Sequence, residues 1–169
     1  MARARAGDAN AFEELLTPVL DPALRLAITM LNDRSAGEDA VQEAALKAWR
    51  KLGQFRAGSD LRPWFLTIVA NECRSSRRSG WWRVIRSGQV VDSWRHRPEE
   101  DELINRVDLA SALERLPKQH LLVLTLYYHL DLPIDEVARV LRCSRGAAKV
   151  RIHRALRALS PSLTMEPVR

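Results

Sequence analysis

The chain has 169 residues, of which 46% are hydrophobic and 28% are charged, a composition that excludes a disordered protein. The formal net charge of +6 favours an anionic partner, although a soluble protein that is basic without such a partner is the alternative. No apolar run approaches the roughly 18 residues of a membrane-spanning helix, and the first residues lack the apolar segment of a secretory signal. We therefore expect a cytoplasmic protein.

Apolar residues recur at helical spacing along nearly the whole chain, and no alternating strand pattern stands out, so we predict an all-α fold. A first helix is expected from about Asp8, its N-cap, to Asn32. Pro18 and Pro22 should break or kink the middle of this helix, because proline lacks the backbone N–H that helical hydrogen bonds use. A second helix is predicted from about residue 36 to residue 52.

A turn-rich stretch over residues 53–60 separates the second helix from a third, which begins near Leu61 with Pro63 in its first turn. The third helix is apolar at its start and becomes basic at Arg74, Arg77 and Arg78. These three helices form a first domain, which we place at residues 1–79.

Residues 80–102 interrupt the helical pattern with glycine, proline and an acidic run at 99–102, and we interpret them as a linker. The linker holds Trp81, Trp82 and Trp94, which are unusual for a flexible tether and are expected to dock on this protein or on a partner. A second domain follows at residues 103–169. Because each domain is small, we expect a partner to add stability.

The second domain is predicted to contain a helix-turn-helix. One helix precedes Pro117, another follows it, and Pro133 opens a short helix with an apolar face. After a three-residue turn, Ser144 caps a last helix that runs to about Leu159, a spacing typical of DNA-binding helix-turn-helix units. Arg142 stands where such turns often carry glycine. A left-handed conformation there costs about 1–2 kcal/mol, so we expect a distorted turn.

The last helix is basic on its outer face: seven Arg or Lys residues and no acid lie between Arg139 and Arg157. A projection at about 100° per residue separates an apolar arc from a basic one. The basic arc carries Lys149, Arg151, His153, Arg154 and Arg157. Arg and Lys bond guanine edges or phosphates, Val150 can touch a thymine methyl group, and the free amides near Ser144 and Arg145 suit a phosphate. The alternative is a solvated basic helix on a bundle.

Ordered motifs in both halves of the chain resemble a known family. The segment from Ala112 to Leu156 is similar to region 4 of bacterial extracytoplasmic-function sigma factors, with a leucine-proline start, a Tyr-Tyr pair, a helix-turn-helix and a His-Arg-Ala. Region 2 of that family is similar to the motifs GDANAFEELL, GEDAVQEAALKAW and DLRPWFLTIVANECRSSRR. The resemblance covers roughly residues 7 to 159. It implies a dissociable subunit of RNA polymerase that binds the core enzyme and promoter DNA.

The resemblance implies that the second helix docks on a coiled coil of the largest polymerase subunit through Asp39, Gln42 and Glu43. Exposed carboxylates and an amide beside an apolar stripe suit a basic helical partner. For Glu43 alone, an ordinary i,i+4 pair with Lys47, worth roughly a few tenths of a kcal/mol, is the alternative. An anti-sigma factor that clamps both domains is a further partner that the resemblance implies.

The same resemblance assigns the third helix and the loop before it, residues 55–61, to the −10 promoter element, where the loop receives a flipped base of the displaced strand. Asn71 matches an asparagine that the family uses at this element, and Trp64 can support stacking. The arginines that neutralise phosphates are Arg74, Arg77 and Arg78. The residues alone leave two alternatives open: Asn71 as a buried polar side chain, and Trp64 as part of the core.

In region 4, the resemblance assigns to the −35 element the residues Arg145, Lys149, Arg151, His153 and Arg154. The sequence departs from the family pattern on or beside this face. Ala147 and Ala148 replace Thr-Val, Val150 replaces Ser, and Arg142 replaces glycine. We therefore expect the docking mode to be kept and the recognised bases to differ.

We predict no enzyme, no cofactor and no metal site, because the sequence holds no clustered carboxylates, no Ser-His-Asp set and no phosphate-cradling glycine loop. Cys73 and Cys143 lack metal-ligand spacing and are expected to be buried free thiols. Two other functions stay open. One is a self-sufficient helix-turn-helix regulator that binds DNA as a symmetric dimer, and the other is a helical adaptor whose basic face meets an acidic protein.

Overall fold

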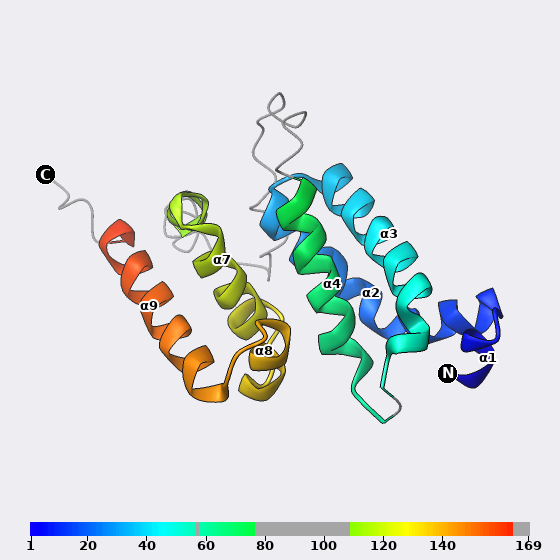
Figure 1. Ribbon diagram of the computed structural model, residues 1–169. Coiled ribbons are helices and arrows are strands. Elements are labelled where there is room, and N and C mark those ends of the chain that lie inside the picture. Colours follow the sequence, from blue (N-terminus) through cyan, green and yellow to red (C-terminus); the bar gives the residue numbers. More distant parts are fainter. Residues whose placement is uncertain (57, 77–108, 164–169) are drawn as a thin grey trace, which may run out of the picture. The chain divides into compact units, whose positions relative to one another are not determined.

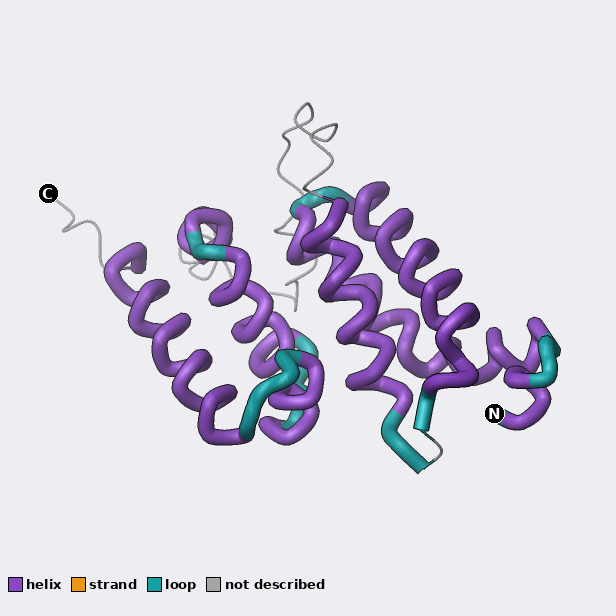
Figure 2. Tube along the Cα trace, viewed as in Figure 1, coloured by secondary structure: helices purple, strands orange, loops and turns teal. Residues whose placement is uncertain are grey.

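The computed structural model describes residues 1–56, 58–76 and 109–163, and every regular element in these ranges is a helix (Figure 1, Figure 2). The predicted all-α fold is therefore confirmed. The chain divides into two compact units, Met1–Arg86 and Ser87–Arg169. The predicted linker, with Trp81, Trp82 and Trp94, lies outside the described residues, so the bounds of the domains stay a prediction.

The first unit is built around three long helices that pack on one another (Figure 1). These are α2 (Ala9–Leu31), α3 (Arg34–Lys51) and α4 (Leu61–Ser76). The short helix α1 (Ala2–Arg5) contacts α2, and a 3-10 helix, η1 (Leu52–Gln54), follows α3. The core between the long helices includes the fully buried side chains of Leu26, Ala44, Phe65, Leu66 and Val69.

Aspartate side chains start both α2 and α3. Asp8 Oδ1 accepts a hydrogen bond of 3.0 Å from the Ala11 amide, which confirms the predicted N-cap. This amide and the Arg3 guanidinium hold the pKa of Asp8 below its usual value. Asp33 Oδ1 accepts from the Ala36 amide at 2.9 Å, so α3 begins at Arg34 rather than at the predicted position 36.

α2 runs through Pro18 and Pro22 without interruption, so of the two predicted effects, a break or a kink, the break is wrong. A proline inside a helix costs about 3 kcal/mol, because it removes a hydrogen bond and crowds the preceding turn. The apolar face of α2 nevertheless stays continuous across both prolines, with Leu16, Val19 and Ala23 buried. Packing of this face on α3 and α4 offsets the local cost, and this contribution is not visible in the local sequence.

Gly37 lies where α3 approaches the backbone of α2. A Cβ atom at this position would stand 2.8 Å from Ile28 Cγ1 and 3.0 Å from the Ile28 backbone nitrogen. We expect Gly37→Ala to lower the free energy of unfolding by about 1–3 kcal/mol, the usual effect of overpacking a filled interface. Urea denaturation followed by circular dichroism measures the change. Gly53→Ala is the control, because a Cβ atom there meets nothing within 4 Å; equal losses in the two variants would contradict this explanation.

Of the two cysteines, Cys73 is buried in α4, and burial raises the pKa of its thiol to about 12. Cys143 is only half-buried, so the expectation of two buried thiols is correct for Cys73 alone. Among the described residues, no group of three or more His, Cys, Asp or Glu side chains is arranged to hold a metal ion. Within the same ranges, no helix is both long and apolar enough to cross a membrane.

The described part of the second unit begins with a helix at residues 109–115. It continues with α7 (Lys118–Leu124), which ends in the π-helical segment η3 (Thr125–His129), and then with α8 (Ile134–Val140) and α9 (Arg145–Leu163). α9 packs on both α7 and α8. Its buried side chains are Ala148, Ile152, Ala155 and Leu159, as the helical spacing predicts. Two helices joined by a short turn, α8 and α9, form the predicted helix-turn-helix.

Candidate nucleic-acid and protein interfaces

The outer face of α3 brings together the three side chains predicted to meet a protein partner. Asp39, Gln42 and Glu43 are all exposed, whereas their neighbour Ala40 is buried. Residues three and four apart share one face of a helix, and the next residue on this face is Leu46. Leu46 is 45% exposed, which is high for a large apolar side chain. The sequence reasoning missed Leu46, although the helical spacing from Gln42 and Glu43 carries the signal.

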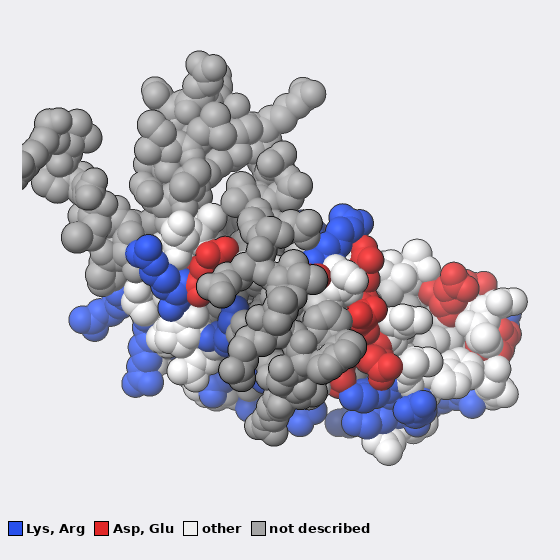
Figure 3. Space-filling view, turned by 90° about the horizontal axis from the view of Figure 1, so that it is seen from above, with Lys and Arg blue, Asp and Glu red and all other residues white. Residues whose placement is uncertain are grey.

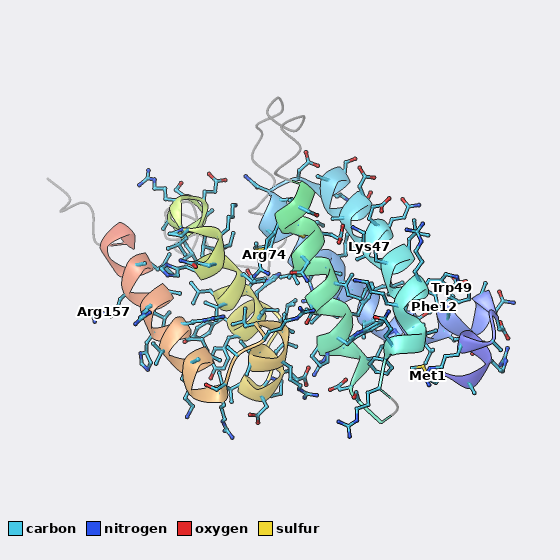
Figure 4. The ribbon with its side chains drawn as sticks, viewed as in Figure 1. Met1, Phe12, Lys47, Trp49, Arg74 and Arg157 are labelled. Carbon is cyan, nitrogen blue, oxygen red and sulfur yellow. The ribbon has the colours of Figure 1, made fainter. Side chains whose placement is uncertain are left out.

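The acidic character of this face depends on whether the nearby Lys47 pairs with Glu43 or with another carboxylate. Lys47, which Figure 4 labels, donates through Nζ to Glu72 Oε2 at 2.5 Å and so ties α3 to α4. The alternative pair between Glu43 and Lys47 is not formed in the described structure. Acidic side chains gather on the first unit (Figure 3). We call the set of Asp39, Gln42, Glu43 and Leu46 the α3 surface: two carboxylates and an amide, followed one turn further along the helix by one exposed apolar side chain.

Asn71 lies on the exposed side of α4, so the interpretation of Asn71 as a buried polar residue is wrong. Its Oδ1 accepts a hydrogen bond of 3.1 Å from Arg74 Nη1. The two exposed side chains therefore form one polar patch near the C-terminal end of α4, where Figure 4 labels Arg74. Arg77 and Arg78, which were predicted to extend this patch, lie outside the described residues.

The loop between η1 and α4 begins with an anchored aromatic side chain. Phe55 is 4% exposed, and its ring centroid lies 4.9 Å from that of Trp64 on α4. Trp64 is half-buried and packs against a buried cluster that includes Leu52, so part of its ring belongs to the core, and its stacking role stays a prediction. The residues after Phe55, Arg56 and those at 58–60, are exposed. The loop thus has a fixed start and an accessible middle.

The turn between α8 and α9 is a regular helix ending. Arg142 has a φ of 50°, which places it in the left-handed region despite the cost to a residue with a side chain. The Cys143 amide donates to the Ala138 carbonyl at 3.0 Å, and the Arg142 amide donates to the Arg139 carbonyl at 3.2 Å. These two bonds are the pattern of a Schellman motif. The expected distortion is therefore wrong, because the turn keeps its standard hydrogen bonds and places the strain on Arg142 alone.

Replacing Arg142 by glycine should relieve this strain. A left-handed conformation costs a residue with a side chain about 1–2 kcal/mol, and part of this gain is lost to the greater freedom of glycine in the unfolded chain. We expect Arg142→Gly to raise the free energy of unfolding of the second unit by about 1 kcal/mol, measured by urea denaturation. Arg142→Ala removes the same charge but keeps the strained backbone. Equal stabilisation by alanine would show that charge, not backbone strain, is responsible.

α9 presents the predicted DNA-binding side chains on its outer face. Ser144 Oγ accepts from the Ala147 amide at 3.2 Å, which confirms the N-cap. All five of the predicted residues are exposed, namely Arg145, Lys149, Arg151, His153 and Arg154. Val150 stands among them and is 48% exposed. Arg157, one turn further along, points away from α7 (Figure 4). We call Arg145, Lys149, Arg151, His153 and Arg154, together with Val150, the α9 surface.

Two of these basic side chains also have contacts within the second unit. Arg145 Nε lies 3.6 Å from Asp135 Oδ1 on α8, and Arg151 Nη1 donates to the Leu141 carbonyl at 3.5 Å. Both partners of the ion pair are more than half exposed, and exposed pairs contribute only about 0–1 kcal/mol. Such contacts orient the two guanidinium groups but are weak enough for an incoming phosphate to replace them. The sequence did not predict either contact.

Two family models match this chain, one over each unit. The model described as Sigma-70 region 2 matches residues 3–83, and the model described as Sigma-70, region 4 matches residues 106–159. The chain is 30% identical over 164 residues to the ECF RNA polymerase sigma factor BldN of Streptomyces coelicolor, a match that covers 94% of this chain and 62% of that relative. It is 28% identical to the RNA polymerase sigma-H factor of Pseudomonas aeruginosa, over 95% of this chain and 90% of the relative.

Solved structures agree with this match. The sigma factor RpoE from Bartonella quintana, in complex with the anti-sigma factor NepR, is similar with a TM-score of 0.67 and 27% identity, over 94% of this chain and 100% of that one. CnrH, in complex with the cytosolic domain of CnrY, is similar with a TM-score of 0.71 and 25% identity, over 96% and 93% of the two chains. With motifs, fold and both regions in agreement, the chain belongs to the extracytoplasmic-function family of RNA polymerase sigma factors.

Proposed function

We propose that this sigma factor acts in the cytoplasm, binds core RNA polymerase and directs it to a restricted set of promoters, without covalent chemistry of its own. The observation that carries the proposal is the presence of two exposed surfaces of different chemistry on separate units. The α3 surface is acidic with an exposed apolar side chain at one end, and the α9 surface is basic. One chain that carries both is suited to hold a protein and DNA at the same time.

The α3 surface is the proposed contact with polymerase. Leu46 supplies apolar area at its C-terminal end, and the carboxylates of Asp39 and Glu43 precede it on the same helix face, which suits a helical partner with basic side chains. The patch of Asn71 and Arg74, with the exposed part of the loop at 55–61, is the proposed contact with the −10 element. The α9 surface is the proposed contact with the −35 element in the major groove.

Control by an anti-sigma factor is the second part of the proposal. Its support is that both solved structures described above are complexes, one with the anti-sigma factor NepR and one with the cytosolic domain of CnrY. A protein that covers the α3 surface would compete directly with polymerase. Affinity purification of this sigma factor from native cells should therefore recover a second protein besides polymerase subunits, and recovery of polymerase alone would contradict this part.

Transcription with purified components tests the main function. The full chain is mixed with core polymerase and a promoter library, and the starts of the transcripts are sequenced. We expect starts that share a −10 and a −35 motif and that disappear when the chain is omitted. Tight binding of the isolated protein to a palindrome as a dimer would instead support a self-sufficient regulator. Binding to an acidic protein with no dependence on DNA would support an adaptor.

The exposed side chain of Val150 leads to a separate prediction about the bases that region 4 recognises. An exposed isopropyl group among cations can gain little from phosphates, and the thymine methyl is the apolar group that the major groove offers. Replacing thymine by deoxyuridine in the −35 element, one position at a time, should weaken holoenzyme binding about fourfold at one position, the value of one buried methyl group. Val150→Ala should be insensitive to the same replacement. A wild-type protein that ignores every replacement would contradict the contact.

A further inference from the structure

A side chain of α1 holds the first residue of the loop at 55–61. The Arg5 guanidinium, through Nη2, donates a hydrogen bond to the Phe55 carbonyl, across 50 positions of the sequence. α1 itself is fixed in place, because Ala4 is 2% exposed and belongs to a buried cluster with Ala11 and Leu52. α1 therefore lies against η1 at the end of the bundle where the chain passes from α3 into the loop (Figure 1).

Phe55 is thus held at two points that fix different degrees of freedom. Its ring is buried against Trp64, which fixes the side chain. Its carbonyl is bound by Arg5, which fixes the orientation of the peptide group that leads to Arg56. Rotation of this peptide group would change the direction in which the exposed part of the loop leaves the core. Hydrogen bonds from a charged donor are among the stronger ones in proteins, so this contact is suited to such a role.

We propose that Arg5 is a positioning residue for promoter opening: through the Phe55 carbonyl, it holds the loop in the conformation that receives an unpaired base of the −10 strand. This inference rests on the proposed function of the loop. Arg3, in contrast, pairs with Asp8, and among the described residues no hydrogen bond or ion pair joins Arg3 to the loop. The two arginines of α1 therefore offer a matched comparison of charge and position.

The test measures binding of holoenzyme, made from core polymerase and the full chain, to single-stranded −10 oligonucleotides with one abasic site at each position in turn. Wild type should lose about tenfold in affinity at the position whose base enters the loop. Arg5→Met keeps the aliphatic stem of the side chain but removes the hydrogen-bond donor. Holoenzyme with Arg5→Met should bind the intact strand about tenfold more weakly than wild type does. It should bind the abasic strand with the same affinity as wild type. Arg5→Lys, which retains a donor, should restore part of the difference.

Arg3→Ala should keep the wild-type abasic profile, and core binding should be unchanged in all variants. If the abasic site lowered the affinity of Arg5→Met as much as that of wild type, the inference would be overturned, because a residue with only a structural role is not coupled to one base. If Arg5→Met fails to fold by circular dichroism, Arg5→Gln decides by the same criterion. Failure of wild-type holoenzyme to bind any −10 strand would instead contradict the proposed function of the loop, so the two failures are distinguishable.

Discussion

Alanine at both Asp39 and Gln42 should weaken binding of this sigma factor to core polymerase by about tenfold to a hundredfold. Each substitution removes one exposed hydrogen-bonding group from the α3 surface. Contacts of this kind contribute about 0.5–1.5 kcal/mol when neutral and more when charged, and 1.4 kcal/mol corresponds to a factor of ten. Titration of the fluorescently labelled variant with core polymerase measures the dissociation constant. Since both side chains point into solvent, the free energy of unfolding should stay unchanged.

Asn10→Ala/Glu14→Ala is the matched control for this variant. It also removes one amide and one carboxylate from an exposed helical face, here on α2, and should bind polymerase as wild type does. Leu46→Ala should in turn weaken binding while leaving every charge in place, because it removes the exposed apolar side chain of the α3 surface. Equal affinities of Asp39→Ala/Gln42→Ala and its control would show that polymerase docks elsewhere.

Alanine at both Lys149 and Arg154 should reduce holoenzyme binding to duplex DNA that carries the −35 element by at least about tenfold at moderate salt. Both side chains are exposed on α9, and each phosphate contact that is lost also removes the release of one counterion. The slope of log K against log salt should therefore become shallower by about 0.9 for each phosphate contact. Binding isotherms at several salt concentrations measure the affinity and the slope together.

A second double substitution, which also removes two positive charges but from the first unit, controls for the change in the net charge of the protein. Arg25 and Arg34 are exposed on the first unit, each in an i,i+4 ion pair, and Arg25→Ala/Arg34→Ala should leave the slope unchanged. If Lys149→Ala/Arg154→Ala weakens binding only at particular base pairs while the slope stays constant, the two side chains read base edges rather than phosphates. An unchanged affinity at every salt concentration would exclude the α9 surface as the DNA contact.

Several local features of the second unit could be predicted from the sequence because their causes lie within a few residues. The N-cap at Ser144 follows from the backbone amides of the first turn of α9. The buried stripe of α9 follows from helical periodicity. The regular form of the turn was not predicted, because the hydrogen bonds of the Schellman motif can form without glycine when the packing of two helices holds the backbone there.

For the candidate interfaces, the sequence predicted the charges of the surfaces better than the exposure of single side chains. The charges of the α3 and α9 surfaces are visible in the sequence, since helical spacing alone decides which residues share a face. Exposure was harder to predict: Asn71 was open to a buried interpretation and is exposed, and Leu46 was missed and is also exposed. Both depend on which face of the helix the other helices cover, and that is a property of the bundle.

The sequence by itself therefore determined the helical class, the order of the motifs and the sign of each surface, because periodicity, capping and charge are local properties. Only the tertiary structure decided the continuity of α2 through its prolines, the pairing of Lys47 with Glu72 and the hold of Arg5 on Phe55. The two pairings join residues 25 and 50 positions apart, and the intact α2 depends on packing against α3 and α4. Such interactions form only when the burial of apolar faces brings distant segments together.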